Sequence, residues 1–234
     1  MERAIVSTSE DPPPIVILSP TNPAIIPSGG PHVYLNLAST IARTEAEGPG
    51  FRYALWVQGC PMRCPGCCNP HYLADRPARA IPVTDLLEEI RQTKGIEGVT
   101  LLGGEPFAQS DALGALAAGV RRAGLSVMVF SGYTLKQLQR DPGAAPLLSQ
   151  TDLLIDGPYI HRQADRSRRW IGSSNQQIHF LTDRYRALEG RWPVGDTLEL
   201  RLNCSADGEV TISINGYPHD NISAMIRASL SRKP

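Results

Sequence analysis

The middle of the chain contains two kinds of hydrophobic pattern, which follow each other in turn. Short apolar runs, typical of buried strands, are separated by segments whose apolar residues recur at helical spacing. The runs predict strands over residues 53–57, 98–102, 126–130 and 152–155. The helical spacing predicts helices over residues 85–93, 111–123 and 135–140, the first with Thr84 as its N-cap. Strand, loop, helix and strand repeated in this order predict parallel strands joined by right-handed crossovers.

The alternation favours an α/β fold, and a whole or partial β/α barrel fits it best. In such barrels the chemistry lies in the loops that follow the C-terminal ends of the strands. The polar and glycine-rich segments of this chain occupy that position after the expected strands. We therefore expect the functional site at this edge of the sheet.

The two ends of the chain differ from its middle. Residues 1–31 contain many prolines, which suit neither a helix nor a central strand, so we expect a loosely docked extension there. Residues 197–203 and 209–215 alternate apolar and polar residues around a central turn. This predicts a β-hairpin that extends or covers an edge of the sheet. The expected division is an N-terminal extension over 1–31, a core over 32–190 and a C-terminal hairpin extension over 191–234.

Charge and hydropathy exclude several classes of protein. The chain has 23 Lys and Arg against 23 Asp and Glu, so it lacks the positive charge that nucleic-acid binding requires. Its apolar runs are too short to span a bilayer, and its first residues do not resemble a secretory signal. We expect a cytoplasmic protein that binds neither nucleic acid nor membranes.

Four of the five cysteines lie close together, at Cys60, Cys64, Cys67 and Cys68. Crowded cysteines in a cytoplasmic protein bind metal more often than they form disulfides. The C-x3-C-x2-C spacing of the first three can ligate three irons of a [4Fe–4S] cluster and leave the fourth iron open for a small molecule with an amine and a carboxylate. Structural zinc is the alternative, with Cys68 or His71 as the fourth ligand.

A second motif, Gly103–Gly104–Glu105–Pro106, ends the expected strand 98–102. Glycines let a backbone approach a ligand closely, and a carboxylate beside them can accept hydrogen bonds from an ammonium group. Because this motif lies one β/α unit after the cysteines, it favours the cluster over zinc.

Together, the two motifs resemble the radical S-adenosylmethionine (SAM) superfamily. More narrowly, the chain is similar over about residues 34–182 to the activating proteins of anaerobic ribonucleotide reductases. The segments that carry this resemblance occur in the same order in that family. They are Gly48–Pro49–Gly50–Phe51–Arg52, Val57–Gln58–Gly59–Cys60, Cys64–Pro65–Gly66–Cys67, Phe130–Ser131–Gly132–Tyr133–Thr134 and Arg169–Trp170–Ile171–Gly172–Ser173–Ser174–Asn175–Gln176. This resemblance implies a partial (β/α)6 radical SAM barrel.

The resemblance also implies which residues bind the cofactors. The cluster ligands would be Cys60, Cys64 and Cys67. The backbone groups offered to the adenine would be those of Gly66, Cys67 and Cys68. The methionyl amine would be held by Gly103, Gly104 and Glu105, and later strand ends would complete the SAM pocket with Ser131, Gly132, Tyr133 and Asp156. Two positions depart from the family: Cys68 replaces the usual aromatic residue, and Ser131 stands where relatives often carry Asp or Thr.

The chemistry that the resemblance implies begins with one-electron reduction of the cluster by a donor such as flavodoxin or ferredoxin. Electron transfer into the sulfonium of SAM then releases a 5′-deoxyadenosyl radical, which abstracts a hydrogen atom. The cofactors supply this chemistry, so no side chain is predicted to be catalytic. The activase-type motifs favour a glycine of a glycyl-radical protein partner as the hydrogen donor. The alternatives are a small molecule or peptide substrate, bound with the help of the additional ends of the chain, and a non-catalytic zinc module.

Overall fold

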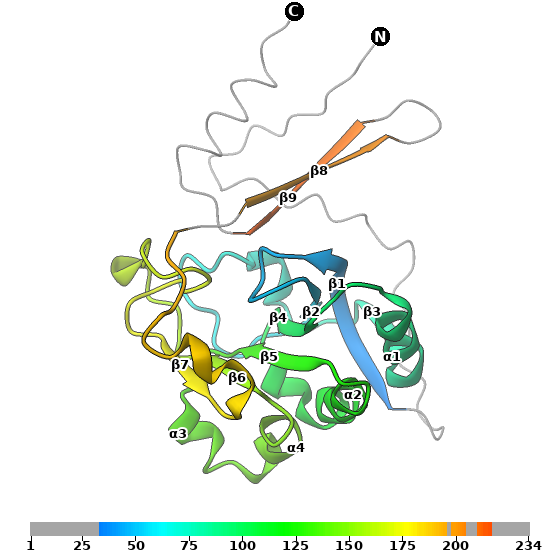
Figure 1. The fold of residues 1–234 in the computed structure, drawn as a ribbon, viewed down its shortest axis with the longest axis horizontal. Helices are drawn as coiled ribbons and strands as arrows, with labels where there is room; N and C mark the ends of the chain where they lie inside the picture. The colour runs from blue at the N-terminus through cyan, green and yellow to red at the C-terminus, as the bar shows by residue number, and fades with distance from the viewer. Residues whose placement is uncertain (1–32, 196–197, 205–209, 217–234) are drawn as a thin grey trace, which may run out of the picture.

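The computed structural model describes residues 33–195, 198–204 and 210–216, and its main feature is a seven-stranded mixed sheet (Figure 1). The strand order is β3-β1-β2-β4-β5-β6-β7. The strands are β1 (Tyr34–Thr44), β2 (Arg52–Val57), β3 (Arg79–Pro82), β4 (Gly98–Gly103), β5 (Ser126–Phe130), β6 (Leu153–Asp156) and β7 (Gln177–Phe180). The α-helices are α1 (Val83–Gln92), α2 (Ser110–Arg122), α3 (Leu135–Leu138) and α4 (Ala145–Leu148). Short 3-10 helices are η1 (Pro70–Tyr72), η2 (Pro106–Gln109), η3 (Pro142–Ala144), η4 (His161–Gln163) and η5 (Asp183–Leu188).

The centre of the sheet is parallel and its flanks are antiparallel. Strands β2, β4, β5 and β6 pair in parallel, which confirms the α/β alternation. Strands β1 and β7 pair antiparallel with β2 and β6, and β3 pairs antiparallel with β1. The expected six β/α units are therefore not found in the described ranges, where the parallel strands number four. The flanking strands were missed for two reasons. Strands β3 and β7 have four residues each, too few to show a period of two, and the eleven residues of β1 contain no continuous apolar run.

The two faces of the sheet bury different side chains, since successive residues of a strand point to opposite faces. On one face, α1 and α2 cover a large apolar cluster that includes Tyr53, Leu55, Leu86 and Leu116. The other face carries Trp56, Leu102 and Phe130, which pack with Tyr72 of η1. Loops rather than long helices lie over this second face, and that leaves room for a binding site.

Helix α1 begins two residues earlier than expected. Its N-cap is Pro82 rather than Thr84, and the Thr84 hydroxyl donates to the Asp85 carboxylate instead. The reason is tertiary: β3 pairs with β1 as far as Pro82, and the chain turns directly from that pairing into the helix.

The C-terminal hairpin is present, but it does not extend the large sheet. Strands β8 (Leu198–Cys204) and β9 (Val210–Gly216) pair antiparallel and form a separate two-stranded sheet. In Figure 1 it lies above the large sheet. The expected turn at 206–208 and the proline-rich extension over 1–31 lie outside the described residues, so the three-part division of the chain stays a prediction. Within the described ranges, no helix is both long and apolar enough to cross a membrane.

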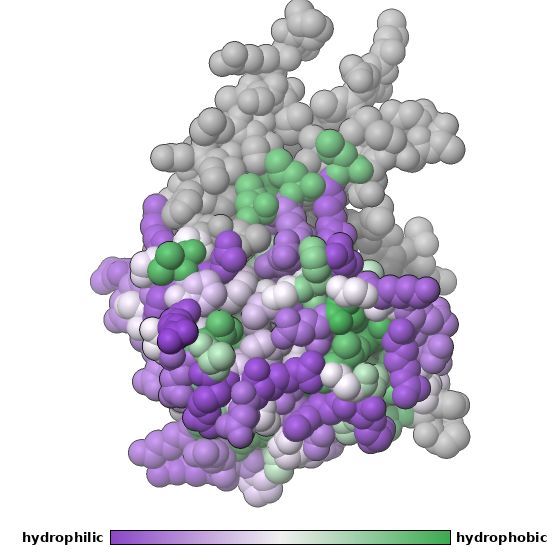
Figure 2. Space-filling model, viewed as in Figure 1, coloured by the Kyte–Doolittle hydropathy of each residue, from purple (hydrophilic) through white to green (hydrophobic). Residues whose placement is uncertain are grey.

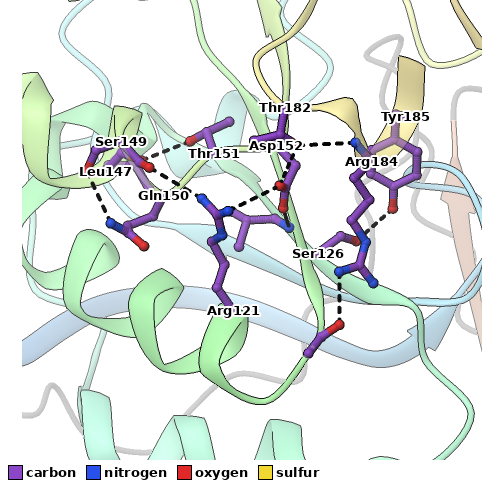
Figure 3. A network of polar contacts seen from close by, with 12 residues as sticks. Arg121, Ser126, Leu147, Ser149, Gln150, Thr151, Asp152, Thr182, Arg184 and Tyr185 are labelled. Atoms are coloured by element: carbon purple, nitrogen blue, oxygen red, sulfur yellow. Dashed lines mark hydrogen bonds and ion pairs between the residues drawn. The ribbon is translucent and has the colours of Figure 1, made fainter.

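A polar network fastens the amino ends of the parallel strands (Figure 3). Asp152, just before β6, accepts hydrogen bonds from the Val127 backbone N–H (2.9 Å) and the Thr182 hydroxyl (2.8 Å). Arg184 of η5 donates to the Gly124 carbonyl at 2.9 Å. These contacts lie at the edge opposite the predicted site, so we assign them to stability.

Arg52 is the largest polar side chain in the interior, and it is fully buried. Its guanidinium donates to hydroxyls and carbonyls from several elements. The acceptors are Thr100 Oγ1 (2.6 Å), Val99 O (2.7 Å), Tyr185 Oη (2.8 Å), Ser126 Oγ (3.1 Å) and Pro49 O (3.2 Å). Burial lowers the pKa of Arg52, a sign that removing this charge from water is costly, and the hydrogen bond to Tyr185 offsets part of that cost.

Replacing Arg52 by Met is expected to lower the free energy of unfolding by about 3 kcal/mol, because it strands several buried acceptors without a donor. Urea denaturation of the metal-free protein measures this change. The matched control is Arg186→Met on η5, where the arginine side chain is 54% exposed and the expected loss is below about 0.5 kcal/mol. Equal losses in the two variants would contradict the assignment.

Candidate functional site

Loops from the carboxyl edge of the parallel strands surround one cavity of about 240 Å3. The cysteine loop follows β2, Gly103–Glu105 ends β4, Ser131–Gly132 follows β5 and Gly157 follows β6, and residues from each of these segments line the cavity. Carboxyl ends of parallel strands meet at the same edge of a sheet, so segments far apart in the sequence converge here.

The cysteine loop places Cys60, Cys64, Cys67 and Cys68 in the cavity wall as free thiols. The Cys67 backbone N–H donates to the Cys64 carbonyl at 3.2 Å, which makes a tight turn between these two ligand positions. A hydrogen bond from the Cys68 thiol lowers the pKa of Cys67 to about 6. This shift favours the thiolate of Cys67, the form that ligates metal. Three thiols on one loop are the donor set that a [4Fe–4S] cluster requires.

Glu105 connects the ends of two neighbouring strands. Its side chain is almost fully buried, and it accepts hydrogen bonds from the Phe107 N–H (3.0 Å), the Ser131 hydroxyl (2.9 Å) and the Gly132 N–H (2.8 Å). Burial raises the pKa of Glu105 to about 7 against the effect of these hydrogen bonds. A carboxylate can accept about four hydrogen bonds, so capacity for a further donor remains.

Two glycines allow the loops to touch. A Cβ at Gly104 would lie 2.1 Å from the Gly59 carbonyl oxygen of the cysteine loop, and a Cβ at Gly132 would lie 2.2 Å from Met62 Sδ. The Glu105 N–H also donates to the Gly59 carbonyl at 2.9 Å. Backbone contact of this kind fixes the height of the cysteine loop above the ends of β4 and β5.

Comparison with known proteins identifies this arrangement. The family described as a 4Fe-4S single cluster domain matches residues 46–179, more than half of the chain. The chain is 33% identical to the anaerobic ribonucleoside-triphosphate reductase-activating protein of Pasteurella multocida over 145 residues, which cover 58% of this chain and 91% of the relative. Against the protein of the same name from Vibrio cholerae the identity is 33%, with 58% and 92% covered. Against the pyruvate formate-lyase-activating enzyme of Staphylococcus aureus it is 38%, with 61% and 60% covered.

The chain belongs to the radical SAM activating-protein family. It is an enzyme, and its cofactors are a [4Fe–4S] cluster and SAM. The family match therefore excludes the zinc module as the explanation of the cysteine motif. Among solved structures the chain is similar to QueE from Escherichia coli, with a TM-score of 0.37, 22% identity, and 43% of this chain and 53% of that chain covered. That similarity is too low to establish a shared fold.

In this radical SAM protein, three predicted site residues do not line the cavity. Gly66 lies on the outer side of the cysteine loop, where a Cβ would be 3.1 Å from His161. Tyr133 packs against the helix-covered core. The Asp156 carboxylate accepts a hydrogen bond from the Leu135 N–H at 2.5 Å and lies 2.9 Å from His179 Nε2, so it fastens α3 and β7. Their predicted roles in SAM binding stay predictions.

Conversely, the structure places unpredicted residues in the cavity wall: Glu47, Trp170, Asn215 and Gly216. Burial and the nearby Glu199 raise the pKa of Glu47 to about 8. Trp170 has a φ of 63°, a backbone conformation that is rare outside glycine. Both residues lie in or beside segments that resemble the family, and this resemblance could have indicated that they belong to the site. Nothing in the local pattern connected the hairpin residues with the site.

The rest of the wall is mainly apolar. It includes Trp56, Leu102, Phe130 and Ile171, three of which come from the open face of the sheet. Such a wall limits the access of water to groups bound in the cavity.

Replacing Gly104 by Ala is expected to lift the cysteine loop away from β4, because the added Cβ meets a backbone oxygen that cannot rotate away. We expect the bound iron and sulfide per chain to fall to less than about half after anaerobic reconstitution, since ligand geometry tolerates only small displacements. Far-ultraviolet circular dichroism should be unchanged.

The matched control is Gly143→Ala. The nearest atom to its Cβ is a carboxylate oxygen of Asp141 at 3.2 Å, which belongs to an exposed side chain far from the cavity. Full iron content in Gly104→Ala would contradict the proposed role of the backbone contact.

Proposed function

We propose that this protein reductively cleaves SAM and generates a glycyl radical on a protein partner. The observation that supports the proposal most directly is the convergence of the cysteine loop, Gly103–Glu105 and Ser131–Gly132 on one cavity. The names of the relatives support the choice of substrate, since they are activating proteins of an anaerobic reductase and of pyruvate formate-lyase. When bound, the reduced cluster supplies the electron that cleaves SAM to a 5′-deoxyadenosyl radical.

The chain's own residues would hold and orient these groups. Cys60, Cys64 and Cys67 would ligate the cluster, and the low pKa of Cys67 favours its ligand form. Glu105 would accept a hydrogen bond from the methionyl ammonium group, close to the Gly104 backbone, and Ser131 and Gly132 would keep its carboxylate in place.

An external one-electron donor of the flavodoxin or ferredoxin kind would reach the cluster from outside the cavity. The outer side of the cysteine loop is exposed at Pro61, Arg63, Pro65 and Gly66. A donor that docks there would come close to the cluster ligands without crossing the substrate cavity. The exposed side of the loop supports this route.

Chemistry on a small molecule or free peptide is the second candidate. One observation allows for it: Asn215 and Gly216 of the hairpin line the cavity from outside the stretch matched by the family, so the substrate can differ from those of the relatives. Formation of 5′-deoxyadenosine that depends on a metabolite, and not on any glycyl-radical protein, would favour this candidate.

The proposed function predicts a glycyl radical on the partner. The anaerobically reconstituted protein, reduced in the presence of SAM and a glycyl-radical protein, should produce the doublet of a glycyl radical in the EPR spectrum and one 5′-deoxyadenosine for each radical. Replacing Cys64 by Ala, which removes one cluster ligand, should abolish both signals. Stoichiometric 5′-deoxyadenosine without a radical on any partner would contradict the proposal.

The proposed role of Glu105 predicts a pH dependence of SAM binding. Its carboxyl is neutral below its pKa of about 7 and ionised above it, and only the ionised form attracts an ammonium group strongly. The dissociation constant for SAM should therefore fall as the pH rises through about 7, up to about tenfold per pH unit on the acid side. Equilibrium dialysis measures it, and Glu105→Gln should bind more weakly with no such dependence. The same pH profile in both proteins would disprove the role.

A further inference from the structure

The C-terminal hairpin is clasped to the end of β1 by polar side chains. The Glu199 carboxylate accepts hydrogen bonds from the Thr44 hydroxyl (2.7 Å) and the Glu45 N–H (2.8 Å). Asn215 Nδ2 donates to the same Thr44 hydroxyl at 2.8 Å, and Arg201 donates to the Arg43 carbonyl. Thr44 is fully buried and Asn215 is only 5% exposed, so the centre of the clasp is shielded from water and its hydrogen bonds hold the hairpin in one position.

The side chains of the hairpin are distributed in an unusual way. Glu199 lies opposite Asn215 in the register and Leu200 lies opposite Ile214, so polar residues share one face and apolar residues share the other. The polar face points to the body of the protein, whereas Leu200 and Leu202 are 53% and 68% exposed. Figure 2 shows apolar surface over β8 and β9. A hairpin that served only to cover the core would present the apolar face inward.

The polar face instead reaches the cavity. Asn215 and Gly216 line it together with Glu47 and Cys68, and the Gly216 backbone lies close enough to the Glu47 carboxyl to favour its ionised form. The clasp therefore ends at the cavity wall, where it joins the hairpin to the segment that precedes the Gly48–Pro49–Gly50 motif.

The comparisons separate this wall from the rest of the site. The family match ends at residue 179, and the groups expected to bind the cluster and SAM lie within it. Relatives that share these cofactors differ in their substrates, as their names show. A wall contributed from beyond the shared stretch is therefore suited to the substrate rather than to the cofactors.

We propose that the β8–β9 hairpin is the substrate-selecting wall of the cavity, and that Asn215 and the Gly216 backbone contact the polypeptide segment from which hydrogen is abstracted. This proposal rests on the proposed function. A side-chain amide offers both donors and an acceptor, as a peptide group does, so the contact suits a polypeptide backbone. Glu199 is a positioning residue, because it holds the hairpin against β1 and does not itself line the cavity.

The test compares Asn215→Ala and Glu199→Ala with Leu200→Ala, a control on the exposed face of the same hairpin. With a glycyl-radical protein as the probe, the KM for that protein should rise about tenfold in the first two variants. Asn215→Ala loses a buried hydrogen bond to Thr44, and Glu199→Ala loses the two hydrogen bonds that hold the hairpin against the end of β1. The dissociation constant for SAM should change by less than about twofold. Leu200→Ala should leave both constants unchanged. An equal weakening of SAM binding, or an unchanged KM, would overturn the proposal.

A second measurement needs no partner. Glu199→Ala should open the wall and speed the bleaching of the reconstituted cluster by oxygen several-fold, because a water-excluding wall also slows the entry of small molecules. If all variants bleach at the wild-type rate, the hairpin is not a wall of the cavity. A different result separates the two proposals: the wild-type protein forms no glycyl radical, but the cluster of Glu199→Ala bleaches faster. In that case the proposed function is wrong, and so is the proposal that the hairpin selects a polypeptide. The position of the hairpin as a wall of the cavity would still be supported.

Discussion

The approach of the β4 end to the cysteine loop is the constraint on which the site depends. Gly104 brings its backbone so close to Gly59 that no side chain fits between them, and the Glu105 N–H donates to the same carbonyl. The Glu105 carboxylate then holds the loop after β5 through Ser131 and Gly132. The segments proposed to bind the cluster and SAM are thus positioned by hydrogen bonds between strand ends, and we expect a change in one of them to displace the others.

Two buried ionisable groups lie at opposite ends of the parallel strands and have different roles. Arg52 lies toward the amino ends, where its hydrogen bonds join β2, β4, β5 and η5. Glu105 lies at the carboxyl ends beside the cavity. Each of the three guanidinium nitrogens of the arginine donates to an acceptor held by the fold, which suits a structural role. The pKa of Glu105, by contrast, lies near neutral pH, so its charge can respond to a bound ammonium group. Stability and ligand binding are in this way assigned to opposite edges of one sheet.

Some residues of the cavity wall lie within the stretch matched by the family, and others lie outside it. The cysteine loop and the β4 and β5 ends lie in the stretch matched by the family, and they carry the residues proposed to bind the cofactors. The hairpin contributes Asn215 and Gly216 from outside that stretch. Its polar face points inward and its leucines are exposed, whereas a hairpin that covered the core would turn its apolar face inward. An enzyme can keep its cofactor chemistry and change its substrate by altering such a wall, because the two sets of contacts come from different segments of the chain.

The sequence by itself determined the four parallel strands, the helices between them and the cofactor motifs, because each of these is a local pattern of spacing or residue type. It did not reveal the antiparallel flanks: β3 and β7 are four residues long, β1 contains no continuous apolar run, and strand direction is decided by pairing partners far away in the chain. Nor did it show that Glu105 bonds to Ser131, that Asp156 fastens α3 and β7, or that Asn215 reaches the cavity. Those contacts join residues between about twenty and more than a hundred positions apart. Only the packing of the sheet, which brings distant strand ends to one edge, could decide them.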